Sequence, residues 1–452
     1  MSSGGGIVAL WRSKFLKDVA TLQLSGMFNQ ASQLVSSIVL AFLLGAQGQG
    51  ALGVAVMLQG LVYNLISVGV IQSTVGHVAS ATARNMPGKV AAWMAFVAKL
   101  YVLFNVILIV GGSFVLPWAG ERFFDSEGLG REIGQWAWWL TLWPLIDTPR
   151  SVVFVALQGT RRMLPLAQLE TSGEIGRAFL VTLGAVLTGG TATGAVIGEI
   201  VSRVLSMVVA LEIYREARAD GGTFLPPLRE VWRHALEIPL RRGIPLALKV
   251  GFVKNVSSVF LKVLPRLIVG AVAGLSWVAY FQIAQRIMDI PMMFLQGVSR
   301  TALPALAAKR GQGDLAGFKR LFLRSSLVGG GLVALLIVAL VPCVPWIVHE
   351  FYPADYAEPV ANVARILAFG LVPMAFAVGL EAFYMVTDQM RASIVLTLLG
   401  CLVTIPVNVW LIRANPETGV FWGLSFYMSW VLVHFAYLVW WFRRAARTGS
   451  LA

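Results

Sequence analysis

The sequence has little charge, little cysteine and little histidine. Only 13% of its 452 residues are charged, against about 25% in soluble proteins, and this shortage excludes an ordinary soluble domain. The two cysteines, Cys343 and Cys401, lie in different apolar runs, so we expect small buried residues and no disulfide. The four histidines have no metal-ligand spacing, and the sequence has no glycine-rich phosphate loop. We therefore predict no enzyme and no cofactor.

Long apolar runs fill the chain instead, and 57% of its residues are hydrophobic. Such runs predict an all-α polytopic membrane protein with about twelve transmembrane helices. We divide it into an N-terminal six-helix lobe (1–214), a cytoplasmic linker (215–242), a C-terminal six-helix lobe (243–442) and a cytoplasmic tail (443–452). The predicted helices are 19–44, 51–76, 90–118, 133–158, 164–187, 193–214, 245–272, 277–306, 325–348, 359–386, 392–412 and 418–442. In the linker, Leu228, Val231, Trp232, Ala235 and Leu236 have helical spacing and predict a helix in the membrane interface.

Lysine and arginine are distributed unevenly over the connections between these helices. In alternate connections from the N-terminus, one set holds 22 of them, whereas the other holds only Arg122, Arg131 and Arg413. Because positive residues collect on the cytoplasmic side, we expect both termini in the cytoplasm. The same bias explains the formal net charge of +14 without nucleic acid as a partner. Residues 1–20 lack a proper apolar core and cleavage pattern, so we expect no cleaved signal peptide.

The two sets of six helices resemble each other in sequence. Leu116-Pro117-Trp118 followed by Phe123-Phe124 recurs as Val344-Pro345-Trp346 followed by Phe351-Tyr352, at an offset of 228 residues. Pro144 and Arg162 similarly match Pro373 and Arg391 at an offset of 229. An even number of helices separates the copies, so they share one orientation in the membrane. We therefore predict two parallel lobes around a central cavity.

Cationic side chains lie deep within the predicted helix 245–272. Lys254 and Lys262 are about 14 and 26 Å from its cytoplasmic end at 1.5 Å rise per residue, too deep for easy snorkelling. Arg266 extends the same face by one turn, and Arg286 follows in the next predicted helix. Charges within a membrane usually face a bundle interior or a water-filled cavity. We predict that these four residues bind an anionic substrate.

Acidic residues lie at helical spacing from arginines in four predicted helices. The sets are Asp147 with Arg150, Glu199 with Arg203, Arg286 with Asp289, and Glu170 and Glu174 with Arg177. One interpretation is structural, because ion pairs can neutralise each other between packed helices. The other is functional, because intramembrane carboxylates can carry coupling protons or sodium ions. The candidates for this role are Asp147, Glu174, Glu199 and Asp289.

Several stretches of the chain resemble one transporter family. They include LAFLLGAQGQGALGVAVMLQGLVYNLISVGV, PRLIVGAVAGLSWVAYFQIAQRIMDIPMMFLQGVSRTALPALAA and FYPADYAEPVANVARILAFGLVP. Together they are similar to polysaccharide flippases of the multidrug/oligosaccharidyl-lipid/polysaccharide (MOP) exporter superfamily. Gly270, Tyr280, Arg286 and Pro304 match family positions, whereas Pro265 stands where an acidic residue often precedes the basic one.

The resemblance implies a flippase of the bacterial inner membrane for lipopolysaccharide or exopolysaccharide biosynthesis. It would move a polyprenyl-diphosphate-linked oligosaccharide from the inner to the outer leaflet by alternating access, coupled to a H⁺ or Na⁺ gradient. Membrane lipids and other polysaccharide assembly proteins are the partners that it implies. The alternatives are a multidrug-type exporter, a membrane glycosyltransferase or ligase acting on lipid-linked sugars, and a scaffold for an assembly complex. The cations of helix 245–272 favour an anionic substrate, and the short external loops argue against sugar transfer.

Overall fold

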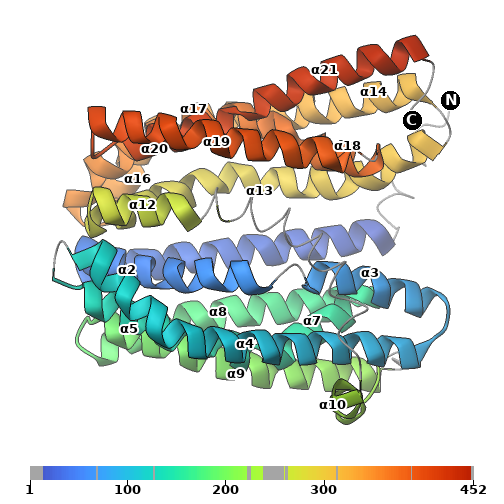
Figure 1. The fold of residues 1–452 in the computed structure, drawn as a ribbon, viewed down its shortest axis with the longest axis horizontal. Helices are drawn as coiled ribbons and strands as arrows, with labels where there is room; N and C mark the ends of the chain where they lie inside the picture. The colour runs from blue at the N-terminus through green and yellow to red at the C-terminus, as the bar shows by residue number, and fades with distance from the viewer. Residues whose placement is uncertain are drawn as a thin grey trace. The chain divides into compact units, whose positions relative to one another are not determined.

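The computed structural model describes residues 14–67, 70–125, 128–220, 225–237, 259, 263–311, 314–387 and 389–448, and every regular element in these ranges is helical. The chain divides into two compact units, residues 1–259 and 260–452, here called unit 1 and unit 2. Each is a bundle of packed helices (Figure 1). The domain boundaries derived from the sequence remain a prediction.

Unit 1 begins with a helix that covers more than one predicted span. α2 (Lys14–Ser67) is continuous except at Gly45, where φ is 65° and ψ is 177°. A positive φ is readily adopted by glycine, so the kink replaces the loop expected between 44 and 51. α3 (Val70–Ala83) and α4 (Pro87–Phe124) follow, and the latter carries Pro117 within it.

The predicted single helix 133–158 is wrong, because the structure contains three helices there. They are α5 (Gly130–Leu140), α6 (Leu142–Ile146) and α7 (Thr148–Gly159). Asp147 lies between α6 and α7, where the chain bends by 46°. Pro144 and Pro149 flank it, and each proline removes a backbone donor and disfavours helix in the preceding residue. The bend therefore has a local cause.

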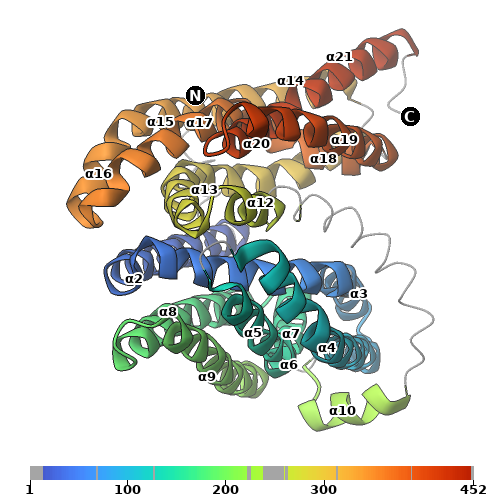
Figure 2. The ribbon, with the colours of Figure 1, turned by 60° about the vertical axis from the view of Figure 1, so that its left-hand side comes forward.

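Two long helices complete the bundle of unit 1. α8 (Met163–Leu187) and α9 (Ala192–Ala219) pack along each other (Figures 1 and 2). A side chain at Gly184 would collide with the backbone of Gly194 on α9, so glycine is required for this close approach.

The linker does contain the predicted helix, α10 (Leu228–Glu237). It packs against α4 (Figure 2), and Val231 and Ala235 lie within the apolar core of unit 1. The hydroxyl of Tyr214 on α9 donates to the carbonyl of Pro226 at 2.7 Å, which fixes the approach to this helix. Trp232 is exposed. The apolar face of α10 therefore rests mainly on protein.

In unit 2 the predicted helices 325–348 and 359–386 are each divided into shorter helical segments. The unit starts with α12 (Leu264–Val272) and α13 (Leu275–Gly311), joined at Gly274 with φ 99°. Next come α14 (Leu315–Arg324), a π-helix η4 (Ser325–Gly329), α15 (Gly330–Leu340), η5 (Val341–Cys343), α16 (Val344–Phe351) and η6 (Ala354–Tyr356). The chain continues with α17 (Ala357–Ala375), η7 (Phe376–Gly379), α18 (Leu380–Val386), α19 (Met390–Ala414), α20 (Gly419–Ser429) and α21 (Val431–Thr448).

Within the described residues, seven helices are long and apolar enough to cross a membrane, or eight if the bent pair around Asp147 counts as one span. One of them, Gln23–Asn64, has 42 residues and covers two predicted runs. α8 is not among them because it carries Glu170, Glu174 and Arg177. Most of the predicted run 245–272 lies outside the described residues.

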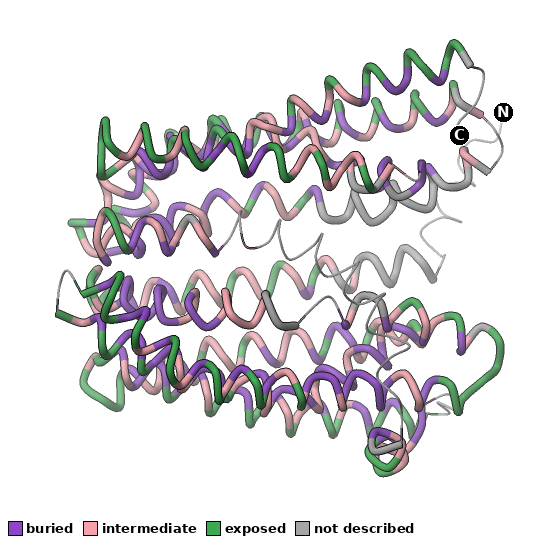
Figure 3. The backbone as a smooth tube through the Cα atoms, viewed as in Figure 1, coloured by how far each residue is buried: buried purple, intermediate pink, exposed green. Residues whose placement is uncertain are grey.

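Both units expose apolar side chains along their helices. Figure 3 shows how exposed residues are distributed along the backbone. On α15, for example, Leu332 is 57% exposed and Leu335 is 65% exposed. Contiguous apolar surface of this kind is typical of contact with lipid rather than with water. Of the two cysteines, Cys401 is buried as expected, whereas Cys343 is exposed, contrary to the prediction, and both are free.

Candidate functional site

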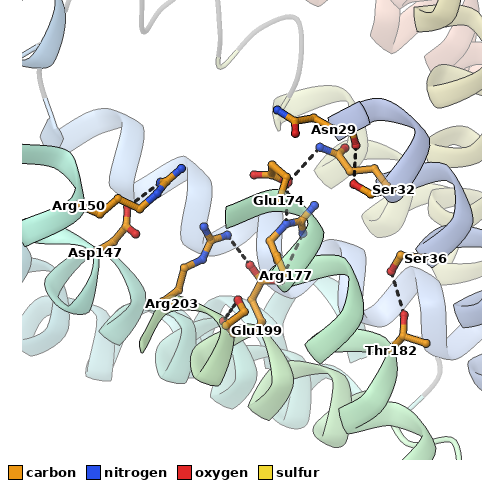
Figure 4. A network of polar contacts seen from close by, with 12 residues as sticks. Asn29, Ser32, Ser36, Asp147, Arg150, Glu174, Arg177, Thr182, Glu199 and Arg203 are labelled. Atoms are coloured by element: carbon orange, nitrogen blue, oxygen red, sulfur yellow. Dashed lines mark hydrogen bonds and ion pairs between the residues drawn. The ribbon is translucent and has the colours of Figure 1, made fainter. Parts of the chain in front are cut away.

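The candidate site residues are divided between the two units. Asp147, Glu174 and Glu199 belong to unit 1, whereas Arg266, Arg286 and Asp289 belong to unit 2. Lys254 and Lys262 lie outside the described residues. The densest polar network that the structure describes is in unit 1 (Figure 4).

Glu199 of α9 is the centre of this network. Its Oε1 accepts a hydrogen bond from Nη2 of Arg203 at 2.7 Å, and its Oε2 accepts from Nη1 of Arg177 at 3.3 Å. The side chains of Glu199 and Arg203 are only 5% and 4% exposed. Charges so deeply buried are tolerated when they are paired and hydrogen-bonded. The contact with Arg177 joins α9 to α8.

Glu174 of α8 extends the network toward α2. Its Oε2 accepts from Nε of Arg177 at 3.0 Å and from the amide of Gln33 at 3.2 Å. Two hydroxyl pairs, Ser25 with Thr171 at 2.7 Å and Ser36 with Thr182 at 3.1 Å, lie along the same helix pair. A polar seam therefore runs between α2 and α8.

Asp147 and Arg150 form the third part, at the bend between α6 and α7. Nη1 of Arg150 donates to Oδ2 of Asp147 at 3.3 Å. A side chain at Gly173 of α8 would come within 3.2 Å of Nη2 of Arg150, so this glycine leaves room for the guanidinium. Trp143 of α6 lies under the guanidinium of Arg203, with 3.8 Å between the guanidinium carbon and the ring centroid. A buried cation–π contact of this type contributes about 2 kcal/mol. The bend is thus in contact with both α8 and α9.

Three of the predicted ion pairs of unit 1 are therefore confirmed, although Asp147 lies just before the helix that carries Arg150. The spacing identified Asp147 with Arg150, Glu174 with Arg177 and Glu199 with Arg203. The sequence analysis missed the bridge from Arg177 to Glu199, the contact between Trp143 and Arg203, and the role of Gln33. These contacts cross between helices, and no spacing within one helix indicates them.

In unit 2, Arg266 of α12 contacts α13. Its Nη2 donates to Oε1 of Gln285 at 2.9 Å, and its guanidinium carbon lies 5.9 Å from the ring centroid of Phe281. Arg286 and Asp289 lie on α13 and are half-buried. Among the described contacts, Arg266 thus has a neutral amide as its hydrogen-bond acceptor. Within the described ranges, no group of three or more histidine, cysteine, aspartate or glutamate residues has the geometry to hold a metal ion.

Comparison with known proteins places this geometry in a transporter fold. The family model MatE matches residues 252–410, which is less than half of the chain. No curated protein shows significant sequence similarity to the chain. A multidrug resistance MATE family transporter of the MOP superfamily, solved in an inward-facing conformation, is 18% identical with a TM-score of 0.76, covering 93% of this chain and 96% of its own.

Two further solved structures agree with this result. A MATE protein in a bent conformation is 18% identical, with a TM-score of 0.66 and coverage of 99% of this chain and 100% of its own. A MOP superfamily transporter from Pyrococcus furiosus is 17% identical, with a TM-score of 0.64 and coverage of 99% of both chains. The protein thus has the all-helical, two-lobe fold of MATE-type membrane transporters, as predicted. The solved proteins that share this fold are described as transporters.

Proposed function

We propose that the protein is a secondary transporter of the MOP superfamily that flips a polyprenyl-diphosphate-linked oligosaccharide across the bacterial inner membrane by alternating access. The observation that carries the substrate assignment is the charge of residues 245–272. This predicted helix contains Lys249, Lys254, Lys262 and Arg266 but no aspartate or glutamate. A cationic segment in a membrane favours an anionic partner, and a diphosphate provides one.

The described surroundings of Arg266 support this proposal. Gln285 offers its guanidinium a neutral oxygen, which orients the side chain, and Asp289 acts on the same guanidinium as a negative charge. In unit 1, by contrast, the three carboxylates and three arginines of the buried network have equal and opposite charge. A balanced network gives no net attraction to an anion, so the segment 245–272 is the better candidate for the headgroup site.

One related structure bears on the alternative of a multidrug exporter. The Pyrococcus furiosus protein is described as having a binding pocket of reverse polarity that suggests a different function. Proteins of this fold therefore differ in the charge that they present to substrates. A cationic segment in this chain favours an anionic lipid over a cationic drug.

The proposal also includes the orientation of the protein in the membrane and the energy source for transport. Both termini would be cytoplasmic, because the basic connections belong on that side. A H⁺ or Na⁺ gradient would drive transport, and other polysaccharide assembly proteins would supply and consume the lipid-linked substrate.

Leaflet exchange in liposomes tests the proposal. The purified full-length chain is reconstituted with a fluorescent polyprenyl-diphosphate oligosaccharide, and Lys254→Ala, Lys262→Ala and Arg266→Ala are compared with wild type. We expect exchange by wild type and at least a tenfold slower rate in the variants. Lys89→Ala, at an exposed position near the start of α4, is the matched control and retains exchange. Export of a cationic dye without lipid exchange would instead identify a drug exporter.

A further inference from the structure

The three carboxylates of the unit 1 network accept different numbers of hydrogen bonds. Both oxygens of Glu199 accept hydrogen bonds from arginines, and Oε2 of Glu174 accepts two. Asp147 accepts only one, on Oδ2, at the longer distance of 3.3 Å. Its Oδ1 is buried and has no hydrogen-bond partner. Asp147 is therefore the least satisfied carboxylate of the network.

This unsatisfied oxygen lies in an enclosed place. Asp147 is 8% exposed and sits in the bend between α6 and α7, beside Arg150 (Figure 4). The Nε atoms of Arg150 and of Arg203, on either side of the network, are also buried without a hydrogen-bond partner. Buried polar atoms are nearly always satisfied, so a group of them marks a place where something binds or moves.

The charges around Asp147 decide what can bind there. Arg150 of α7 and Arg203 of α9 act on it as positive charges, and Glu174 of α8 acts as a negative charge. From α2 and α4, the electrostatically coupled groups are Tyr63 and Tyr101, whose hydroxyls are 3.1 Å apart. Lys99 of α4 and Glu170 of α8 have interactions of their own. A metal cation needs several oxygen ligands and would be repelled by two guanidinium groups. A proton needs only one oxygen and converts the carboxylate to a neutral carboxyl, so neither restriction applies to it.

We propose that Asp147 takes up and releases the coupling proton, while Glu174 and Glu199 stay ionised as counter-charges for the arginines. Adding a proton to Oδ1 breaks no existing hydrogen bond, whereas protonating Glu199 would disrupt a contact with Arg203 or Arg177. The proton arrives from water on one side of the membrane and leaves to the other. Its role as a coupling ion rests on the proposed transport function, but its binding does not.

Protonation changes the forces on the arginines. With Asp147 neutral, Arg150 loses its ion-pair partner, and three arginines face the two remaining carboxylates, Glu174 and Glu199. The gain of one positive charge shifts the arginines within the network. Because Arg203 stacks on Trp143 at 3.8 Å, this shift changes the environment of an intrinsic fluorophore at the bend.

The test is a pH titration of tryptophan fluorescence on the purified full-length protein, without substrate. We expect wild type to show a pH-dependent step that disappears in Trp143→Phe and in Asp147→Asn. Glu212→Gln, which removes an exposed carboxylate outside the network, is the matched control and retains the step. A step that persists in Asp147→Asn would overturn the proposal, as would a step that appears only when sodium is added.

A second measurement counts protons directly, so the proposal does not depend on one fluorophore. A pH-indicator dye follows proton uptake when the same preparations are acidified. Over the pH interval of the fluorescence step, Asp147→Asn should bind one proton fewer than wild type, whereas Trp143→Phe, which keeps every carboxylate, should bind the same number. Equal uptake by wild type and Asp147→Asn would contradict the assignment. Since neither measurement uses a lipid substrate, failure of lipid exchange with an intact titration would reject the proposed substrate alone.

Discussion

The two units interrupt corresponding helices at corresponding places but put different residues there. In unit 1, Pro144 is followed by the bend at Asp147, and in unit 2, Pro373, 229 residues later, is followed by η7, which begins at Phe376. The first interruption holds Asp147 and Arg150 and contacts a buried charge network. The second consists of Phe376, Ala377, Val378 and Gly379 and faces the π-helix η4. A shared backbone feature thus serves polar chemistry in one unit and apolar packing in the other.

The same contrast applies to charge. Unit 1 balances its buried carboxylates with arginines three or four residues away and, between Arg177 and Glu199, across two helices, so its network is neutral and internally bonded. The segment 245–272, which leads into unit 2, carries four basic residues and no acidic residue. Under the proposals made above, the network of unit 1 binds a proton and the segment 245–272 binds an anionic headgroup.

The largest loss of stability should come from removing the central carboxylate of the unit 1 network. Glu199→Ala leaves Arg203 and Arg177 without their shared carboxylate, and breaking a buried pair costs about 3–5 kcal/mol. Unfolding in mixed micelles measures this loss. Glu212→Ala on the same helix is the control, because its pair with Arg215 is 3.9 Å long and its side chain is 61% exposed. An equal loss in both variants would show that the network does not stabilise unit 1.

An aspartate introduced into η7 of unit 2 tests whether this interruption tolerates a charge. Val378 is buried, and Val378→Asp would put a charge where the described residues of η7 offer no counter-charge. We expect a loss of about 3 kcal/mol, comparable to the cost of an aspartate in a membrane core. Val378→Ala, which removes only methyl groups, should lose about 1 kcal/mol by the same unfolding assay. If Val378→Asp is as stable as Val378→Ala, unit 2 also accommodates charge at this interruption.

Glycine substitutions examine how closely the helices approach each other. Gly184→Ala on α8 forces the side chain against the backbone of Gly194 on α9, and overpacking of this kind costs about 1–3 kcal/mol. In unit 2, Gly331→Ala meets only the ring edge of Phe376 at 3.9 Å, and alanine favours helix over glycine by about 0.5–1 kcal/mol. The two variants should therefore shift the unfolding midpoint in opposite directions. A destabilised Gly331→Ala would contradict the packing difference.

The smallest expected effect concerns the contact that joins the bend to α9. Trp143→Leu removes the ring beneath Arg203 and should lower stability by about 1–2 kcal/mol, the value of a desolvated cation–π contact. Trp346→Leu is the control in unit 2, because this side chain is 65% exposed. Its substitution should leave the unfolding midpoint nearly unchanged. A similar loss at both positions would mean that Trp143 contributes only apolar surface.

The sequence by itself determined the class of the protein and the pairs within single helices. Apolar runs of membrane-spanning length predict helices whatever their neighbours are, and a spacing of three or four residues brings Glu199 beside Arg203 or Asp147 beside Arg150. Regularity along one helix is a local property, so these predictions needed no tertiary structure. The subdivision of 133–158 was missed because hydrophobicity alone does not report the backbone effect of Pro144 and Pro149.

Only the tertiary structure decided which charges meet across helices. Arg177 reaches Glu199, Gln33 reaches Glu174, and Arg203 stacks on Trp143. The members of each pair come from different helices, and the rotation and approach of those helices depend on packing, as at Gly184 and Gly194. The unsatisfied Oδ1 of Asp147 depends on the same packing, because an atom lacks a partner only when every neighbouring helix fails to provide one. Hydrogen bonds act over about 3 Å, a distance that the sequence controls within one helix but not between two.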